Sequence, residues 1–187
     1  MKILIVSGFL GAGKTTFIKR LARNVDQQFA ILENEYGAAG IDGARLGQNR
    51  QGTQKNVWEM TEQCICCIGK KDFAASVLTI ANVVDPEYLI VEPTGVGSLA
   101  RIIENLRQIE YERIQLLSPV TIVDVYSYRR YMAEYPELYQ DQIRSADTII
   151  VSKTEACQAE EKQRIQKFLQ EINPQAKIIT DYASTMT

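Results

Sequence analysis

The chain has 187 residues, with 21 Lys plus Arg and 23 Asp plus Glu, so its formal net charge is −2 at pH 7. This balance gives no electrostatic reason to expect a nucleic acid or an anionic membrane as the main partner. The absence of histidine excludes hydrolases that use a histidine base and metal sites built on imidazole. The length predicts one domain over residues 1–187.

The start of the chain carries no pattern typical of export. Its first apolar run stops after four residues, whereas a signal peptide needs about 7–15 apolar residues and a membrane span about 20. Three of the four cysteines lie within four positions, which makes a poor disulfide framework. We therefore expect reduced thiols and a cytoplasmic protein.

Short apolar runs alternate with amphipathic stretches along the chain. The apolar runs lack polar alternation, which is typical of strands buried on both faces of a parallel sheet. Strands are predicted over residues 2–7, 29–33, 57–60, 88–92, 120–125, 148–152 and 177–180. Apolar spacings of three and four predict helices over residues 14–25, 72–83, 99–109, 136–146 and 159–172. The order predicts an α/β fold with a doubly wound, mostly parallel sheet between two layers of helices.

A phosphate-binding motif joins the first strand to the first helix. The run Gly8-Phe9-Leu10-Gly11-Ala12-Gly13-Lys14-Thr15-Thr16 fits G-x-x-x-x-G-K-[ST] between a strand and a helix. Its glycines let successive N–H groups face one anion, and the positive end of the helix faces the same point. We predict a nucleoside triphosphate site in which Lys14 reaches the β and γ phosphates, Thr15 binds Mg²⁺ and Thr16 reaches the α phosphate. Gly8, Gly11, Ala12 and Gly13 supply the backbone of this site.

A magnesium ion also needs a carboxylate at the end of a neighbouring strand. Glu92 meets this need because Pro93 keeps it out of the helical region. Gly95 follows three residues later and brings a bare backbone N–H towards the γ phosphate. Asp124 is the alternative acid, although a polar residue at a strand end also serves as a cap. We prefer Glu92.

Recognition of the base is expected after the sixth predicted strand, at Ser152, Lys153 and Glu155. Guanine-binding proteins of this kind place Asn-Lys-x-Asp there. The carboxylate of Glu155 is able to accept from guanine N1–H and N2–H, and the stem of Lys153 is able to cover one face of the base. These residues favour guanine over adenine, and the alternative is a plain turn between strand and helix.

Three thiols form a second candidate site. Cys64, Cys66 and Cys67 sit in one local loop, and thiolates select Zn²⁺, Cu(I) or a similar ion. Three sulfurs leave one tetrahedral position, for which Glu35 and Glu62 are candidates. The structural alternative is a set of small buried residues beside the sheet. Cys157 stands alone and is expected to pack.

Four tyrosines repeat at spacings of three, four and four residues: Tyr128, Tyr131, Tyr135 and Tyr139. The spacing indicates one side of a helix, facing either a partner or the core, and Pro136 interrupts it. No function follows from the pattern itself.

Together these motifs resemble the nucleotide-binding domain of the CobW/HypB/UreG family of SIMIBI-class P-loop GTPases, and its CobW-like branch in particular. The matching segments run from residue 1 to about residue 180, and the most specific is the thiol motif within a P-loop domain. They are the loop at 8–16, Asn34-Glu35-Tyr36-Gly37 with Gly40-Ile41-Asp42, residues 64–67, residues 92–95, Val123-Asp124 and residues 152–155.

The resemblance implies a GTP-dependent metallochaperone or metallocofactor-insertion protein with a client metalloprotein as partner. By this likeness residues 35–42 correspond to switch I, and Asp42 lies near Mg²⁺ or the attacking water. Lys14, Asp42 and Glu92 are then the catalytic residues, and Thr15, Glu92 and Asp42 the magnesium site. The three cysteines, with Glu35, hold Zn²⁺ or another thiophilic ion whose coordination changes with the nucleotide. A homodimer formed across the nucleotide is also implied.

The chain departs from the family pattern at several positions. Ala38 replaces an acidic residue, and Gln63 replaces a glycine before the thiol motif. Ser152 and Glu155 replace Asn and Asp, which weakens the expectation of tight GTP specificity. CobW-like proteins usually continue into a second domain, so we expect the part that docks a partner to be absent or on another chain.

Our main hypothesis is slow GTP hydrolysis by in-line attack of water, with Lys14, the loop amides and Mg²⁺ stabilising the developing charge. One rival is a non-hydrolysing scaffold whose nucleotide and zinc sites shape a partner-binding surface. Another is an ATP-dependent activator of a corrinoid or metalloenzyme.

Overall fold

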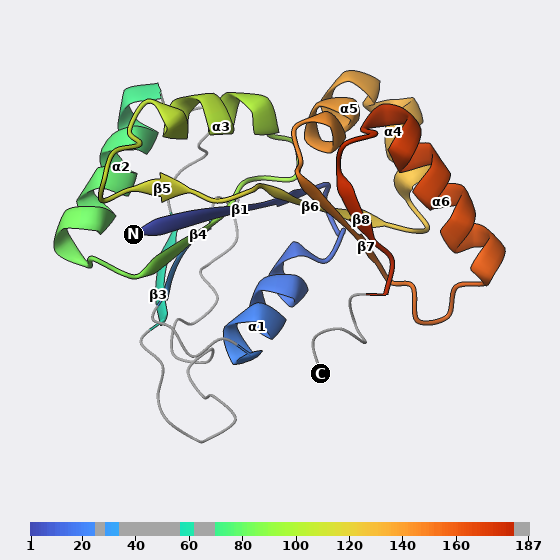
Figure 1. Ribbon diagram of the computed structural model, residues 1–187, viewed down its shortest axis with the longest axis horizontal. Coiled ribbons are helices and arrows are strands. Elements are labelled where there is room, and N and C mark those ends of the chain that lie inside the picture. The colour runs from blue at the N-terminus through green and yellow to red at the C-terminus, as the bar shows by residue number, and fades with distance from the viewer. Residues whose placement is uncertain (25–28, 34–56, 62–69, 182–187) are drawn as a thin grey trace.

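The computed structural model describes residues 1–24, 29–33, 57–61 and 70–181 (Figure 1). Its eight strands form one sheet in the order β3-β2-β4-β1-β6-β7-β8, and β5 also pairs with β1. Every ladder between these strands is parallel. The strands are β1 (Lys2–Gly8), β2 (Phe29–Glu33), β3 (Val57–Thr61), β4 (Tyr88–Glu92), β5 (Gln115–Leu116), β6 (Val120–Asp124), β7 (Thr148–Ser152) and β8 (Lys177–Ile179).

The central strand β1 changes partners along one of its edges. Its first half pairs with β4 on one side and with β5 on the other. Its last three residues pair with β6, with Gly8 opposite Ile122. The carboxyl ends of β4, β1, β6 and β7 therefore meet at one edge of the sheet, which is where open parallel sheets place their ligands.

Helices cover both faces of the sheet (Figure 1). The helix α1 (Lys14–Asn24) packs on one face, where Phe17 and Ile18 meet Ile31 and Ile122. On the other face, α2 (Lys70–Val83) and α3 (Leu99–Arg107) pack over β1, β2 and β4. The helices α4 (Tyr128–Glu134), α5 (Pro136–Arg144) and α6 (Ala159–Ile172) continue this layer over β6 and β7.

The predicted fold class is confirmed, and the predicted helix and strand bounds differ from the observed ones by a few residues. Two elements were not predicted. The strand β5 is only two residues long, too short to show a periodic pattern. The helix α4 is seven residues long and ends at Glu134, with Tyr135 as its cap, and Pro136 starts α5. The four tyrosines therefore run over two helices.

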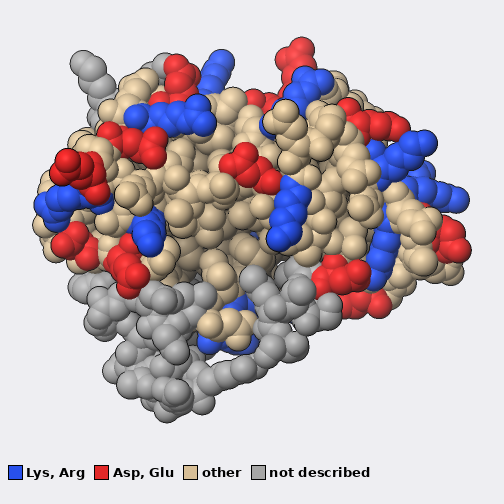
Figure 2. Space-filling model, in the orientation of Figure 1, with Lys and Arg blue, Asp and Glu red and all other residues tan. Residues whose placement is uncertain are grey.

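Among the described residues, no helix is long and apolar enough to cross a membrane. Figure 2 shows acidic and basic side chains interspersed over the visible face, in keeping with the nearly balanced charge of the chain.

Candidate functional site

The phosphate loop leaves β1 at a residue that only glycine fits. Gly8 has φ 144°, and a Cβ there would lie 2.5 Å from the carbonyl oxygen of Ile122 on β6. Gly11 and Gly13 also have positive φ, 72° and 98°. The motif therefore sits where it was expected, between β1 and the start of α1 at Lys14.

Lys14 lies folded against the loop that it follows. Its side chain is buried, and Nζ donates to the carbonyl oxygens of Gly8 at 3.0 Å and Phe9 at 3.4 Å. This ammonium therefore lies against the backbone of the loop. Thr16 is exposed on the first turn of α1.

Thr15 and Glu92 meet across the site. The hydroxyl of Thr15 donates to the Glu92 carboxylate, at 3.1 Å to Oε1 and 3.4 Å to Oε2. A hydroxyl beside a carboxylate is an all-oxygen pair of the type that Mg²⁺ prefers. This contact favours Glu92 over Asp124 as the acid of the phosphate site.

The loop that follows Glu92 packs directly on the phosphate loop. A Cβ at Gly95 would lie 2.5 Å from the backbone nitrogen of Leu10 and 3.0 Å from the carbonyl carbon of Phe9. A glycine at this position therefore lets two backbones approach, and any other residue would push the two loops apart.

Ser152 holds the phosphate loop from the side of β7. Its buried hydroxyl donates to the carbonyl oxygen of Ala12 at 2.6 Å. In the structure this side chain contacts the loop, and its neighbour Lys153 has a positive φ of 62°. Glu155 is exposed in the turn between β7 and α6.

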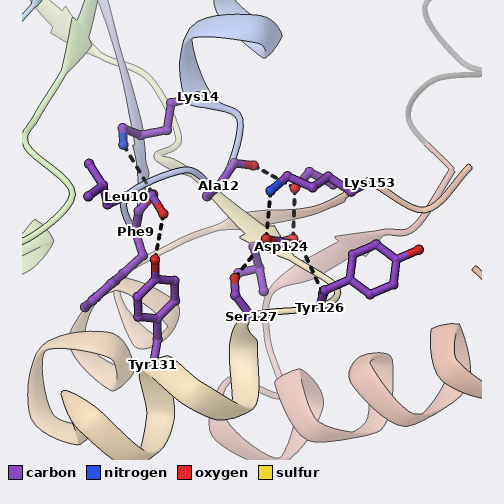
Figure 3. A network of polar contacts seen from close by, with 11 residues as sticks. Phe9, Leu10, Ala12, Lys14, Asp124, Tyr126, Ser127, Tyr131 and Lys153 are labelled. Atoms are coloured by element: carbon purple, nitrogen blue, oxygen red, sulfur yellow. Dashed lines mark hydrogen bonds and ion pairs between the residues drawn. The ribbon is translucent and has the colours of Figure 1, made fainter.

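Asp124 is engaged in local bonds at the end of β6 (Figure 3). Its carboxylate accepts from the amide of Tyr126 at 2.9 Å, from the hydroxyl of Ser127 at 2.9 Å and from Nζ of Lys153 at 2.8 Å. The Asp124 side chain is 9% exposed and the Lys153 side chain 48%. Asp124 thus acts as the cap of a turn, as the alternative interpretation of this acid expected.

Burial raises the pKa of Asp124, but the bonds from Lys153, the Tyr126 amide and Ser127 outweigh burial and hold this pKa below its ordinary value of 3.8. A carboxylate with a lowered folded-state pKa stabilises the fold above the unfolded pKa, and that stabilisation is lost as the pH falls through the folded pKa.

We therefore expect the wild type to exceed Asp124→Asn in unfolding free energy at neutral pH, and the difference to shrink once the pH falls below 3.8. Urea unfolding of both proteins across a pH series measures it. In protein that also carries Lys153→Met, which removes the charged partner of Asp124, Asp124→Asn should lower the unfolding free energy by less. If the difference in unfolding free energy between wild type and Asp124→Asn stayed constant to pH values well below 3.8, these bonds would not stabilise the ionised carboxylate.

An aromatic cluster braces the back of the phosphate loop. The ring of Phe9 is buried, and its centroid lies 4.6 Å from that of Tyr131, 5.7 Å from Tyr135 and 5.1 Å from Tyr139. The hydroxyl of Tyr131 donates to the carbonyl oxygen of Leu10 at 2.9 Å (Figure 3). The tyrosine stripe therefore faces the phosphate loop, which the spacing by itself did not reveal.

Several predicted site residues lie outside the described residues, so the structure does not test them. They are the thiols Cys64, Cys66 and Cys67, the acids Glu35 and Glu62, and Asp42 of the expected switch I. Cys157 is described; it is half-buried and packs against the aromatic and aliphatic cluster under α6, as expected.

Comparison with known proteins adds to this geometry. A sequence model described as the CobW/HypB/UreG nucleotide-binding domain matches residues 2–180. The zinc chaperone YeiR of Escherichia coli is 31% identical over 170 residues, covering 89% of this chain and 51% of that protein. The zinc chaperone CobW of Pseudomonas aeruginosa is 27% identical over 194 residues, covering 88% and 52%. The chain thus spans about half the length of these curated relatives.

Solved structures share the fold. The Zn(II)-bound YjiA GTPase from E. coli aligns with a TM-score of 0.70 at 23% identity, covering 96% of this chain and 57% of that one. HypB from Helicobacter pylori in complex with nickel aligns with a TM-score of 0.61 at 18% identity, covering 94% and 76%. At these identities the likeness establishes the architecture alone.

Proposed function

Because the chain belongs to the CobW/HypB/UreG nucleotide-binding domain family, we propose that it binds GTP, hydrolyses it slowly and uses the cycle to deliver a metal ion to a client metalloprotein. The observation that carries this proposal is the contact between Thr15 and Glu92 beside the phosphate loop. It joins the hydroxyl and the carboxylate that a Mg²⁺–triphosphate site requires.

In this proposal each described group has a separate task. The loop amides and Lys14 bind the phosphates, and they stabilise the negative charge that develops during transfer. Thr15 and Glu92 hold Mg²⁺, which neutralises charge on the β and γ phosphate oxygens when bound. Asp42 orients the attacking water. Because neither acid is paired with a histidine, intrinsic turnover is expected to be low.

The base of the nucleotide is proposed to lie beside Lys153 and Glu155. Glu155 is exposed in its turn, so its carboxylate is available to accept from a guanine edge. Ser152 supports the same region indirectly, through its bond to Ala12. This assignment favours GTP, with ATP as the competitor.

The cargo in this proposal is zinc, held by Cys64, Cys66 and Cys67 with Glu35. Support comes from the thiol motif itself and from relatives named zinc chaperones. Thiolate ligands also fit other thiophilic ions. Switch I and the thiol loop carry the coupling to nucleotide, and a nucleotide-dependent homodimer is part of the same proposal.

We expect the protein to take up zinc at about one ion per chain and Cys66→Ser to abolish that uptake, because losing one of three thiolates opens the coordination shell. Equilibrium dialysis measures it. Cys157→Ser is the matched control, since Cys157 packs under α6, and it should bind zinc normally. Both variants should keep GTP affinity, which depends on the phosphate loop.

Two results would overturn parts of the proposal. Unchanged zinc uptake by Cys66→Ser would remove the thiol site. Normal zinc and GTP binding without any turnover in a single-turnover assay would replace the GTPase by a non-hydrolysing scaffold.

A further inference from the structure

The helix α5 supports the loop that follows Glu92. Gln142 on this helix is 1% exposed, and its Nε2 donates to the carbonyl oxygens of Gly95 at 3.1 Å and Gly97 at 3.0 Å. Its own backbone carbonyl accepts from the hydroxyl of Thr121 on β6 at 2.9 Å. The loop is therefore attached to a helix that is itself attached to the sheet.

The preceding residue of α5 holds the other end of the same loop. The carboxylate of Asp141 accepts from the amides of Leu99 at 2.7 Å and Ala100 at 3.4 Å. These are the first residues of α3, whose amides lack partners within their own helix. Two consecutive side chains thus fix both the loop and the start of the helix after it.

Gly95 is confined on its opposite side as well. The position of its missing Cβ lies 2.5 Å from the backbone nitrogen of Leu10, and the carbonyl oxygen of Leu10 accepts from Tyr131 on α4. Gly95 is therefore enclosed between the phosphate loop and Gln142. If Gly95 moved towards the phosphate loop it would lose its contact with Gln142, and if it moved towards Gln142 it would lose its contact with the phosphate loop.

Within the part of the chain that the structure describes, only the nitrogen of the Gln142 side-chain amide is hydrogen-bonded. Its Oε1 is buried and finds no donor among the described residues, and a buried acceptor without a donor is destabilising. An apolar side chain of the same length would avoid that cost. Such an apolar side chain could not donate the two hydrogen bonds to the loop at 95–97.

We infer that Gln142 is a positioning residue that sets where Gly95 stands relative to the phosphate loop, and so sets the preference of the site for a nucleoside triphosphate over a diphosphate. The inference rests on the proposed function and on the expectation from the sequence that the Gly95 N–H faces the γ phosphate. A diphosphate has no γ phosphate, so the position of Gly95 affects triphosphate affinity more than diphosphate affinity.

The test is the ratio of GTP to GDP affinity in Gln142→Met, measured by calorimetry in the presence of Mg²⁺. Methionine keeps the length and the packing but donates no hydrogen bond. We expect the ratio to fall about fivefold to tenfold, the size expected for losing one hydrogen bond, the one from the Gly95 N–H to the γ phosphate. Gln140→Met is the matched control: Gln140 lies on the same helix, its amide donates to Met132 Sδ at 3.8 Å, and the variant should keep the wild-type ratio.

If Gln142 only stabilised the fold, Gln142→Met would lower the melting temperature or weaken the binding of GTP and GDP equally. An unchanged ratio of GTP to GDP affinity would overturn the inference. If Gln142→Met does not fold, Asp141→Ala decides, because Asp141 is only half-buried and holds the other end of the loop. The ratio of GTP to GDP affinity in Asp141→Ala should also fall, by a smaller factor than in Gln142→Met. A wild type that binds neither nucleotide would overturn the proposed function itself, which is a distinct result.

Discussion

Replacing Lys14 with alanine is expected to lower GTP affinity about a hundredfold or more while the fold persists. The ammonium lies against the carbonyl oxygens of Gly8 and Phe9. Two charge-assisted hydrogen bonds to phosphate oxygens contribute about 1.5–3 kcal/mol each. Their loss corresponds to at least about 3 kcal/mol, or roughly two orders of magnitude in the dissociation constant.

Isothermal titration of GTP into wild type and Lys14→Ala measures this effect. Lys19→Ala is the matched control, because it removes a positive charge from the same helix one turn further on without reaching the loop. A loss of similar size in both variants would show that long-range charge, and not the position of Lys14, governs affinity. Equal affinity in Lys14→Ala and wild type would remove the triphosphate assignment.

Gly8→Ala should destabilise the protein by about 3 kcal/mol, a large part of the stability of an ordinary domain. The new Cβ would stand 2.5 Å from the carbonyl oxygen of Ile122, and Gly8 also has φ 144°. The contact is with backbone at the centre of the sheet, so β1 and β6 would have to separate to relieve it.

Gly11→Ala separates backbone strain from the steric contact with β6. Gly11 also has positive φ, 72°, but apart from its chain neighbours no atom of the described residues lies within 4 Å of its missing Cβ. Backbone strain alone predicts a loss of about 1 kcal/mol. Urea unfolding of the two variants should therefore differ clearly. Equal losses would mean that the approach of β6 contributes nothing and that φ alone dictates glycine at residue 8.

The fold could be predicted where strands are buried on both faces. Runs such as residues 149–151, all three of which are buried, show as continuous apolar segments because both faces are covered. The order of the strands could not be predicted in the same way, since β1 pairs with β4 and β6, both more than eighty residues away. No local pattern records such a pairing.

The loop of the candidate phosphate site was predictable because its residues are close together in the sequence. Glycines, Lys14 and Thr15 act within one turn of chain, and Glu92 is marked by the proline after it. The residues that support the site escaped prediction for the opposite reason. Gln142 stands between Asp141 and Ile143 on an amphipathic helix, where glutamine is typical of a solvent-facing position. Only the tertiary contact with residues 95–97 distinguishes it.

The tyrosines form an intermediate case. Their spacing was visible, and the core-facing alternative is confirmed for Tyr128 and Tyr139, which are buried. What the spacing could not give was the partner, because Phe9 lies more than a hundred residues earlier in the chain. A bulky aromatic inside a phosphate-binding motif was the available signal, since a loop that is only exposed has no use for a buried ring.

The sheet is assembled from two stretches of chain that meet only along β1. Strands β1–β4 come from residues 2–92 and β6–β8 from residues 120–179. During synthesis the first stretch leaves the ribosome while one edge of β1 still lacks β6. The phosphate loop starts at Gly8, which pairs with Ile122, so an unfinished chain carries the whole motif without the neighbour that shapes it. Nucleotide binding at the proposed site would therefore favour chains in which the two stretches have joined.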